Sequence, residues 1–213
     1  MQRPIPMIAA CAISLLGSTA WAQDAYRAPT RSVAPAQDFR VNAGLGAFSG
    51  DTLDGGVMSA LLATYRVGPV EVGGTLEGGS EVLGGGYSMV GAVAGPVWRS
   101  DFGLRVELLG VLGQDHYSGV GCGLFCSGGG ASATLPYGGA RAGASYAFGR
   151  RRAHFELGGS VFYGTDLEKQ HVEYTTTGGL DLWGNGDNVN EDEMTLGGER
   201  MGGMLTLGLV VDG

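Results

Sequence analysis

The sequence lacks several features that mark common protein classes. It contains one lysine, Lys169, among thirteen basic residues, and its net charge is −8. A chain with this balance and no basic face is not expected to bind nucleic acid, because such binding depends on neutralising phosphates. After the N-terminal segment there is also no apolar run of the ~18 residues that a membrane-spanning helix needs.

Glycine, by contrast, is abundant, at 42 of 213 residues, and follows no collagen-like period. This content argues against a helical protein, since glycine destabilises helix interiors. It does not indicate disorder, because several segments alternate apolar and polar residues in a way that allows burial.

The N-terminus has the organisation of an export signal. Arg3 precedes an apolar run at residues 7–16, and Ala20-Trp21-Ala22 offers small residues at the positions that a signal peptidase reads. We therefore predict a signal peptide at residues 1–22, a periplasmic lead-in at 23–37 and one folded domain at 38–213.

Alternation of apolar and polar residues predicts the strands. In residues 102–108 the even-numbered residues are apolar, and the odd-numbered ones are Gly103, Arg105 and Glu107, so the two sets lie on opposite faces of a strand. Eight strands are predicted, at about residues 39–48, 57–67, 70–80, 87–99, 102–113, 137–148, 153–165 and 201–211.

The predicted connections alternate in length. Short turns fall near residues 68, 100 and 150, and longer loops fall at 49–56, 81–86, 114–136 and 166–199. This asymmetry is typical of bacterial outer-membrane barrels. We therefore predict an all-β fold, an eight-stranded antiparallel up-and-down transmembrane β-barrel with short periplasmic turns and longer extracellular loops.

Charged residues in the predicted strands lie opposite the apolar face. They are Arg40, Arg66, Glu71, Glu77, Arg105, Glu107, Arg141 and Glu156. An arginine facing lipid at mid-depth costs about 2–4 kcal/mol, so these side chains are expected to point into the barrel. Eight strands enclose an interior that side chains can fill, and buried charges must be paired. We predict a lumenal salt-bridge network that plugs the barrel.

Two soluble folds would also alternate. A two-sheet sandwich would expose ordinary solvated charges on one face, and a soluble ligand-binding barrel would need an apolar interior and a polar exterior. The export signal, the loop asymmetry and a set of aromatic residues near strand ends favour the membrane barrel. These residues, Phe39, Tyr65, Trp98, Phe102, Phe148 and Phe155, fit an aromatic girdle at the membrane interface.

Over about residues 38–213 the chain resembles the small outer-membrane β-barrel superfamily of OmpA-like and OmpX-like proteins. The resemblance rests on the export signal, the eight amphipathic segments and the terminal segment Leu205-Thr206-Leu207-Gly208-Leu209-Val210-Val211. It implies a location in the bacterial outer membrane, with outer-membrane lipid and the barrel-insertion machinery as partners. No cofactor is predicted.

Cys122 and Cys126 remain after removal of the signal and lie in a glycine-rich predicted loop. In an oxidising compartment we predict that they form a disulfide that stiffens this loop. A metal site there would need further cysteine or histidine ligands, of which His116 is the nearby candidate.

The predicted loop at 166–199 is strongly acidic. Asp181, Asn185, Asp187 and Asp192 partly match the spacing of a calcium-binding loop, although Trp183 stands where an oxygen ligand belongs. We predict a solvated surface loop that is available to an extracellular ligand, with weak calcium binding as the alternative.

No set of histidine, serine and acidic residues has a defined triad spacing. His116-Tyr117-Ser118 and His171 lie in predicted loops, and His154 is expected to be a lumenal hydrogen-bonding residue. We predict a non-enzymatic envelope scaffold or surface-interaction protein that works through its extracellular loops. The alternatives are a small passive pore and a lipid-modifying outer-membrane enzyme.

Overall fold

The computed structural model describes residues 37–81, 84–120, 130–148, 153–177 and 189–212. Regular structure in these residues consists of β-strands. They are β1 (Gln37–Gly50), β2 (Gly56–Val67), β3 (Val70–Glu81), β4 (Gly86–Arg99), β5 (Leu104–Val120), β6 (Ala131–Phe148), β7 (Ala153–Asp166), β8 (Gln170–Thr177), β9 (Val189–Leu196) and β10 (Glu199–Asp212). No helix in this part of the chain is long and apolar enough to cross a membrane.

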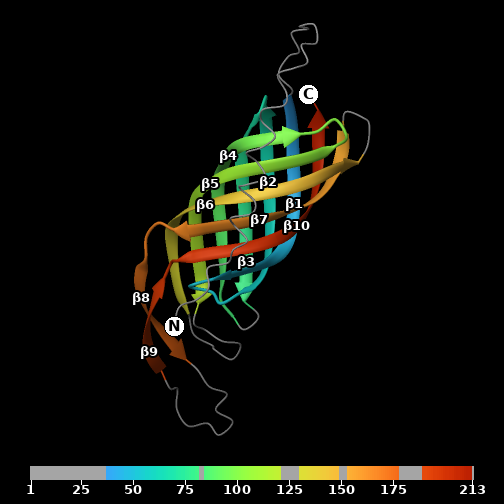
Figure 1. Ribbon diagram of the computed structural model, residues 1–213. Helices are drawn as coiled ribbons and strands as arrows, with labels where there is room; N and C mark the ends of the chain where they lie inside the picture. The colour runs from blue at the N-terminus through green and yellow to red at the C-terminus, as the bar shows by residue number, and fades with distance from the viewer. Residues whose placement is uncertain (1–36, 82–83, 121–129, 149–152, 178–188, 213) are drawn as a thin grey trace, which may run out of the picture. The chain divides into compact units, whose positions relative to one another are not determined.

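Eight of these strands close into an antiparallel barrel (Figure 1). The order around the barrel is β1-β10-β7-β6-β5-β4-β3-β2, and β1 pairs with β10 from Asp38↔Asp212 to Gly50↔Arg200. Closure satisfies the backbone groups that a sheet edge would leave unpaired, which is what a bilayer requires. The predicted eight-stranded up-and-down fold is confirmed.

The two ends of the barrel differ in their connections. Gly68 and Pro69 join β2 to β3, and residues 100–103 join β4 to β5, at the end where β1 begins and β10 finishes. The opposite end carries the connection at 51–55 and the β8–β9 hairpin, which is inserted between β7 and β10 (Figure 1). Short turns lie on the periplasmic side of outer-membrane barrels and longer connections outside, so the hairpin is extracellular.

The exterior of the barrel is apolar. Large apolar side chains face outward from every barrel strand, and Leu205 in β10 and Leu45 in β1 are 76% and 72% exposed. All of the aromatic residues predicted for the girdle are exposed, and they lie near the periplasmic ends of the barrel strands, Phe102 in the turn between β4 and β5. An apolar exterior around a charged interior is the inverse of a soluble barrel, so this barrel is built for the bacterial outer membrane.

The apolar band ends part of the way along β5. Its outward side chains change from Leu112 to Gln114, His116 and Ser118. The segment of β5 from residue 114 to Val120 therefore projects beyond the lipid on the extracellular side.

The structure corrects the prediction of long loops at 114–136 and 166–199. β5 continues to Val120 and β6 begins at Ala131, while the second segment contains the paired strands β8 and β9. Both corrections have the same cause. Beyond the lipid the side chains still alternate between inward and outward, but the outward ones are mostly polar, so the sequence no longer shows the apolar–polar pattern that predicted the other strands. The fifth strand also begins at Leu104 rather than Phe102, because Gly103 adopts a φ of +95° in the preceding turn.

Candidate functional site

The barrel interior holds the residues predicted as a lumenal charge network. Their side chains face inward from six strands, and all except Arg66 are buried, with exposures of 0–6%. By strand they are Arg40 in β1, Arg66 in β2, Glu71 and Glu77 in β3, Arg105 and Glu107 in β5, Arg141 in β6 and Glu156 in β7. The structure thus brings together on the inside residues that are spread over more than half of the sequence.

Two arginines link carboxylates from different strands. Arg105 pairs with Glu71 and lies 3.4 Å from Glu107. Arg40 pairs with Glu107 and lies 3.1 Å from Glu156. Each of these carboxylates therefore meets a guanidinium from another strand, which is the condition for keeping charges stable away from water.

Hydroxyl groups and a further ion pair extend this network. Thr64 donates a hydrogen bond to Glu71, and Ser145 donates one to Glu156 at 3.0 Å. Further toward the extracellular end, Arg141 pairs with Glu77. Thr64 bonds the Glu71 oxygen Oε1 and Arg105 bonds Oε2, so both oxygens of this buried carboxylate have partners.

A group at the periplasmic mouth was missed by the sequence reasoning. Asp38 lies 2.5 Å from Arg66 and 3.3 Å from Arg99, and the Arg99 guanidinium donates to His154 at 2.8 Å. His154 therefore faces the interior, where it was expected. Asp38 could have been found, because it shares the parity of Arg40, but it fell one residue before the first predicted strand.

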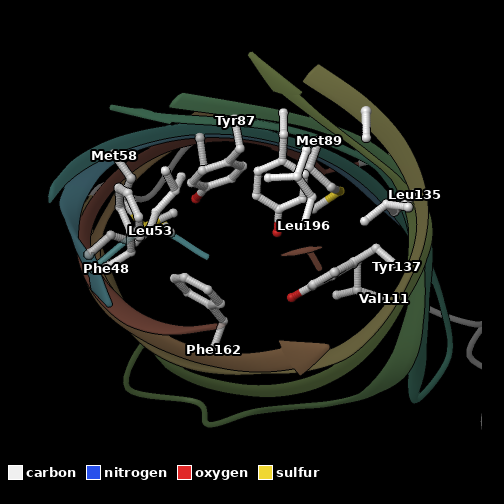
Figure 2. Packing of buried hydrophobic residues seen from close by; sticks show 14 of the residues in the cluster. Phe48, Leu53, Met58, Tyr87, Met89, Val111, Leu135, Tyr137, Phe162 and Leu196 are labelled. Carbon is white, nitrogen blue, oxygen red and sulfur yellow. The ribbon is translucent and has the colours of Figure 1, made fainter. Parts of the chain in front are cut away.

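The extracellular half of the interior is apolar, which was not predicted. Figure 2 shows Phe48, Tyr87, Tyr137 and Phe162 pointing inward from opposite parts of the wall. The fourth predicted strand, at residues 87–99, is apolar on both faces for this reason, since Tyr87 and Met89 face inward while Val90 and Trp98 face outward. A side chain at Gly79 would meet the rings of Tyr87 and Phe48 at 2.4 and 2.7 Å, so glycine here makes room for the aromatic cluster.

One cation lies within this apolar region. Arg200 forms a 2.7 Å ion pair with Asp115, and its guanidinium carbon lies 3.8 Å from the ring centre of Tyr87 and 4.9 Å from that of Tyr137. Aromatic faces attract guanidinium groups, most strongly where water is excluded. Arg200 was missed because it lies just before the last predicted strand.

The apolar cluster is closed on its extracellular side. Leu53, from the connection between β1 and β2, is 2% exposed, and Leu196 at the end of β9 is fully buried. Nearer the middle of the barrel, a cavity of about 10 Å³ lies between Asn42 and Arg141, which is room for about one water. Side chains therefore fill the interior along the described strands.

Several predicted site residues lie elsewhere. Cys122, Cys126, Asp181, Asn185 and Asp187 are outside the described residues. Asp192 is exposed in β9, opposite Tyr174 in β8. In the described ranges, no group of three or more histidine, cysteine or acidic residues is arranged to hold a metal ion. The disulfide and the calcium site remain predictions.

The histidines considered for catalysis are on the outside. Nδ1 of His116 lies 3.0 Å from Oγ1 of Thr134, and Nδ1 of His171 lies 2.8 Å from Oγ1 of Thr195. The two histidines are exposed and lie on different strands, β5 and β8.

No protein-family model matches the chain, and no curated protein matches it in sequence. Solved structures do match it. Neisserial surface protein A (NspA) superposes with a TM-score of 0.50 at 15% identity, covering 82% of this chain and 96% of that one. Ail, the attachment invasion locus protein of Yersinia pestis, gives a TM-score of 0.41 at 16% identity, covering 85% of this chain and 100% of that one. The chain has the fold of the small outer-membrane β-barrels.

Proposed function

We propose that this barrel is a non-enzymatic surface-interaction protein that binds an extended segment of another protein at the extracellular edge of β6. The observation that carries the proposal is the part of β6 that continues past the end of its pairing with β7. The hydrogen-bonding groups of that edge and the charge of the neighbouring hairpin define the ligand.

The pairing of β6 is one-sided near its extracellular end. On one side, β6 pairs with β5 from Val120↔Ala131 downward. On the other side, its pairing with β7 begins only at Tyr137↔Asp166. Among the described residues, no backbone ladder pairs with residues 131–135 of β6 on the β7 side. β8 lies close to β6, so a segment that adds to this strand would have to displace β8 from it.

A hydrogen bond at Pro136 shows to which side the backbone N–H and C=O groups of this stretch point. Its carbonyl accepts a 2.8 Å hydrogen bond from the backbone N–H of Leu167, which lies just after β7. Backbone groups alternate sides along a strand, so the N–H and C=O of Thr134 and Ser132 face the same side as the Pro136 carbonyl. They form the template to which an extended segment can add as a further strand.

The neighbouring hairpin favours a basic ligand. Glu173 in β8 and Glu193 in β9 are direct cross-strand partners, and both are exposed. Glu191, opposite Thr175, lies on the same face. Like charges directly opposite one another destabilise a sheet, and a cationic partner would offset that cost. The acidic segment predicted to meet an extracellular ligand supplies this face.

The alternatives have less support. A passive pore needs a water-filled interior, whereas ion pairs and the apolar cluster occupy this one. A lipid-modifying enzyme of the triad type needs a histidine that an acidic side chain orients beside its nucleophile. His116 and His171 each contact a threonine hydroxyl, but within the described residues neither is bonded to an acidic side chain.

The proposal is tested by peptide binding to the barrel in lipid nanodiscs. The probes are a peptide of alternating lysine and valine and the matching peptide of glutamate and valine. Thr134→Pro removes an edge N–H and should abolish binding of the lysine peptide, whereas Thr134→Ala keeps the backbone and should bind like the wild type. Equal binding to Thr134→Pro and to the wild type would disprove the edge, and equal binding of both peptides would disprove the charge preference.

A further inference from the structure

Two buried carboxyl groups are connected to one guanidinium at the extracellular end of the interior, Asp115 directly and Asp166 through a tyrosine hydroxyl. Asp115 in β5 is fully buried and Asp166 in β7 is 6% exposed. Arg200 lies 2.7 Å from Asp115, while the hydroxyl of Tyr117 donates to Asp166 at 2.7 Å. Tyr117 lies 3.4 Å from Arg200, so it connects the two carboxyl groups.

The cluster of Asp115, Asp166, Tyr117 and Arg200 is bonded to the base of the β8–β9 hairpin through Asp166. The N–H of Gly198 donates to the Asp166 carboxylate at 3.1 Å, and the N–H of Asp166 donates to the Gly198 carbonyl at 3.1 Å. Gly197, with a φ of +100°, forms the bend beside it and donates to Oγ1 of Thr52 at 2.9 Å. The bend therefore connects the interior carboxyl groups to the hairpin outside.

The charges around Asp115 do not balance. Arg141 in β6 is already paired with Glu77 in β3. Among the described residues, Arg200 is therefore the one cation bonded to the two carboxyl groups, directly at Asp115 and through Tyr117 at Asp166. The other titratable groups that face Arg200 are Tyr87, Tyr117 and Tyr137, from β4, β5 and β6. Oδ1 of Asp115 has no hydrogen-bond partner among the described residues. A buried charge without a full set of partners is costly, and a proton on one carboxyl group removes that cost.

We propose that Asp115 is a pH-sensitive latch, which holds the base of the β8–β9 hairpin closed when its carboxyl group is protonated and loosens it when the group ionises. The proton neutralises the surplus charge while Asp166 keeps its bonds to Tyr117 and Gly198. Ionisation places a second negative charge beside Asp166 in an apolar site, and opening of the bend relieves the repulsion by admitting water.

The direction of the pH effect follows from burial. Asp115 lies on the part of β5 beyond the lipid, and burial raises the pKa of its carboxyl group to about 7 despite the contact with Arg200. In an opened, hydrated state the group returns to its ordinary pKa of about 3.9. Protonation therefore favours the closed latch fully below about pH 4, and this contribution is lost as the pH rises to about 7.

Lys169 provides the test, because it is the only lysine of the chain and lies exposed between β7 and β8. A lysine-specific protease needs several residues of accessible, extended chain around its site, so cleavage of the folded barrel here should become faster when the bend opens locally. Cleavage rates of the wild type and of Asp115→Asn are compared at pH 5.5 and pH 8.5 in the same detergent. Their ratio at each pH cancels the pH dependence of the protease itself.

We expect the ratio of wild-type to Asp115→Asn cleavage to rise by about tenfold or more from pH 5.5 to pH 8.5. His171 lies near Lys169, so His171→Gln serves as the control and should show the wild-type rise. A ratio that stays constant, or a rise that disappears in His171→Gln, would overturn the latch.

A second measurement covers the case in which Asp115→Asn does not fold. Hydrogen-exchange protection factors of the Leu196 and Gly198 amides in the wild type should fall over the same pH interval, and unchanged protection would overturn the latch. Control of ligand binding by the latch rests on the proposed function. The latch itself does not, because cleavage and exchange are measured without a ligand.

Discussion

Arg105 and Glu71 are 34 residues apart in the sequence and form an ion pair across the barrel interior. Their strands, β5 and β3, are not neighbours, because β4 lies between them in the wall. The pair therefore joins parts of the barrel that no backbone hydrogen bond connects. Interior ion pairs of this kind supplement the strand ladders as cross-links of the wall.

Removal of one partner should destabilise the barrel strongly. Glu71→Ala leaves Arg105 with a buried charge that has lost its main partner, and we expect a loss of about 3–5 kcal/mol in the free energy of unfolding. Urea unfolding followed by heat-modifiable gel migration measures it. Asp101→Asn, in the exposed periplasmic turn, should change stability by less than about 0.5 kcal/mol. Equal midpoints for the two variants would show that the interior pair carries no structural role.

The free-energy cost of a charged side chain on the lipid-facing wall should depend on its depth in the membrane. Leu205→Arg places a guanidinium in the apolar band and should cost about 2–4 kcal/mol in lipid, whereas Ser118→Arg, beyond the band, should cost about 0–1 kcal/mol. Unfolding titrations in phospholipid vesicles compare the two. If Leu205→Arg is tolerated as well as Ser118→Arg, this part of the exterior does not face lipid.

Glycine in β7 should be required for the aromatic cluster. A side chain at Gly164 would lie 2.0 Å from the Tyr137 hydroxyl oxygen, so Gly164→Ala must displace the ring that lies beside Arg200. We expect a loss of about 1–3 kcal/mol by overpacking. Gly74→Ala is the matched control, because its nearest neighbour atom would be 3.6 Å away. Equal unfolding midpoints for both variants would contradict the packing.

A filled interior should not conduct ions. The purified barrel reconstituted in planar bilayers is expected to give no stable conductance steps, since the cavity between Asn42 and Arg141 holds about one water. Reproducible steps from the wild type would favour the pore over the surface-interaction function.

The disulfide between Cys122 and Cys126 remains a prediction. Protein isolated from the envelope should resist thiol alkylation until it is reduced and should then gain two labels, which intact-mass spectrometry detects. Stabilisation by this bond should be modest, because the loop that it closes is short. Two free thiols before reduction would refute it.

Alternation predicted the barrel strands because one face of each must meet lipid and the other must avoid it. It located the inward positions of Arg105 and Glu107 directly. The same rule extended by a few residues would have reached Asp115 and Tyr117, which share their parity. It was not extended, because the outward residues change to Gln114 and His116, and a strand without an apolar face resembles a loop in sequence.

The partners of the interior charges could not be predicted. Arg40 meets Glu107 and Glu156, on strands that lie far from β1 in the sequence. Which side chains meet inside depends on the register of every ladder between them, and a shift of one residue would turn the chosen side chains outward. The apolar extracellular half was also hidden, because the inward Tyr87 and Met89 of β4 look like part of a lipid-facing segment.

Sequence alone determined the class of fold and the face of most barrel strands that meets lipid, since both follow from local alternation and the cost of placing charge in a bilayer. Only the tertiary structure decided that the interior divides into a charged periplasmic half and an apolar extracellular half, and that Asp115, Asp166 and Arg200 meet beneath the β8–β9 hairpin. Such meetings are set by barrel closure and register, which act between residues far apart along the chain.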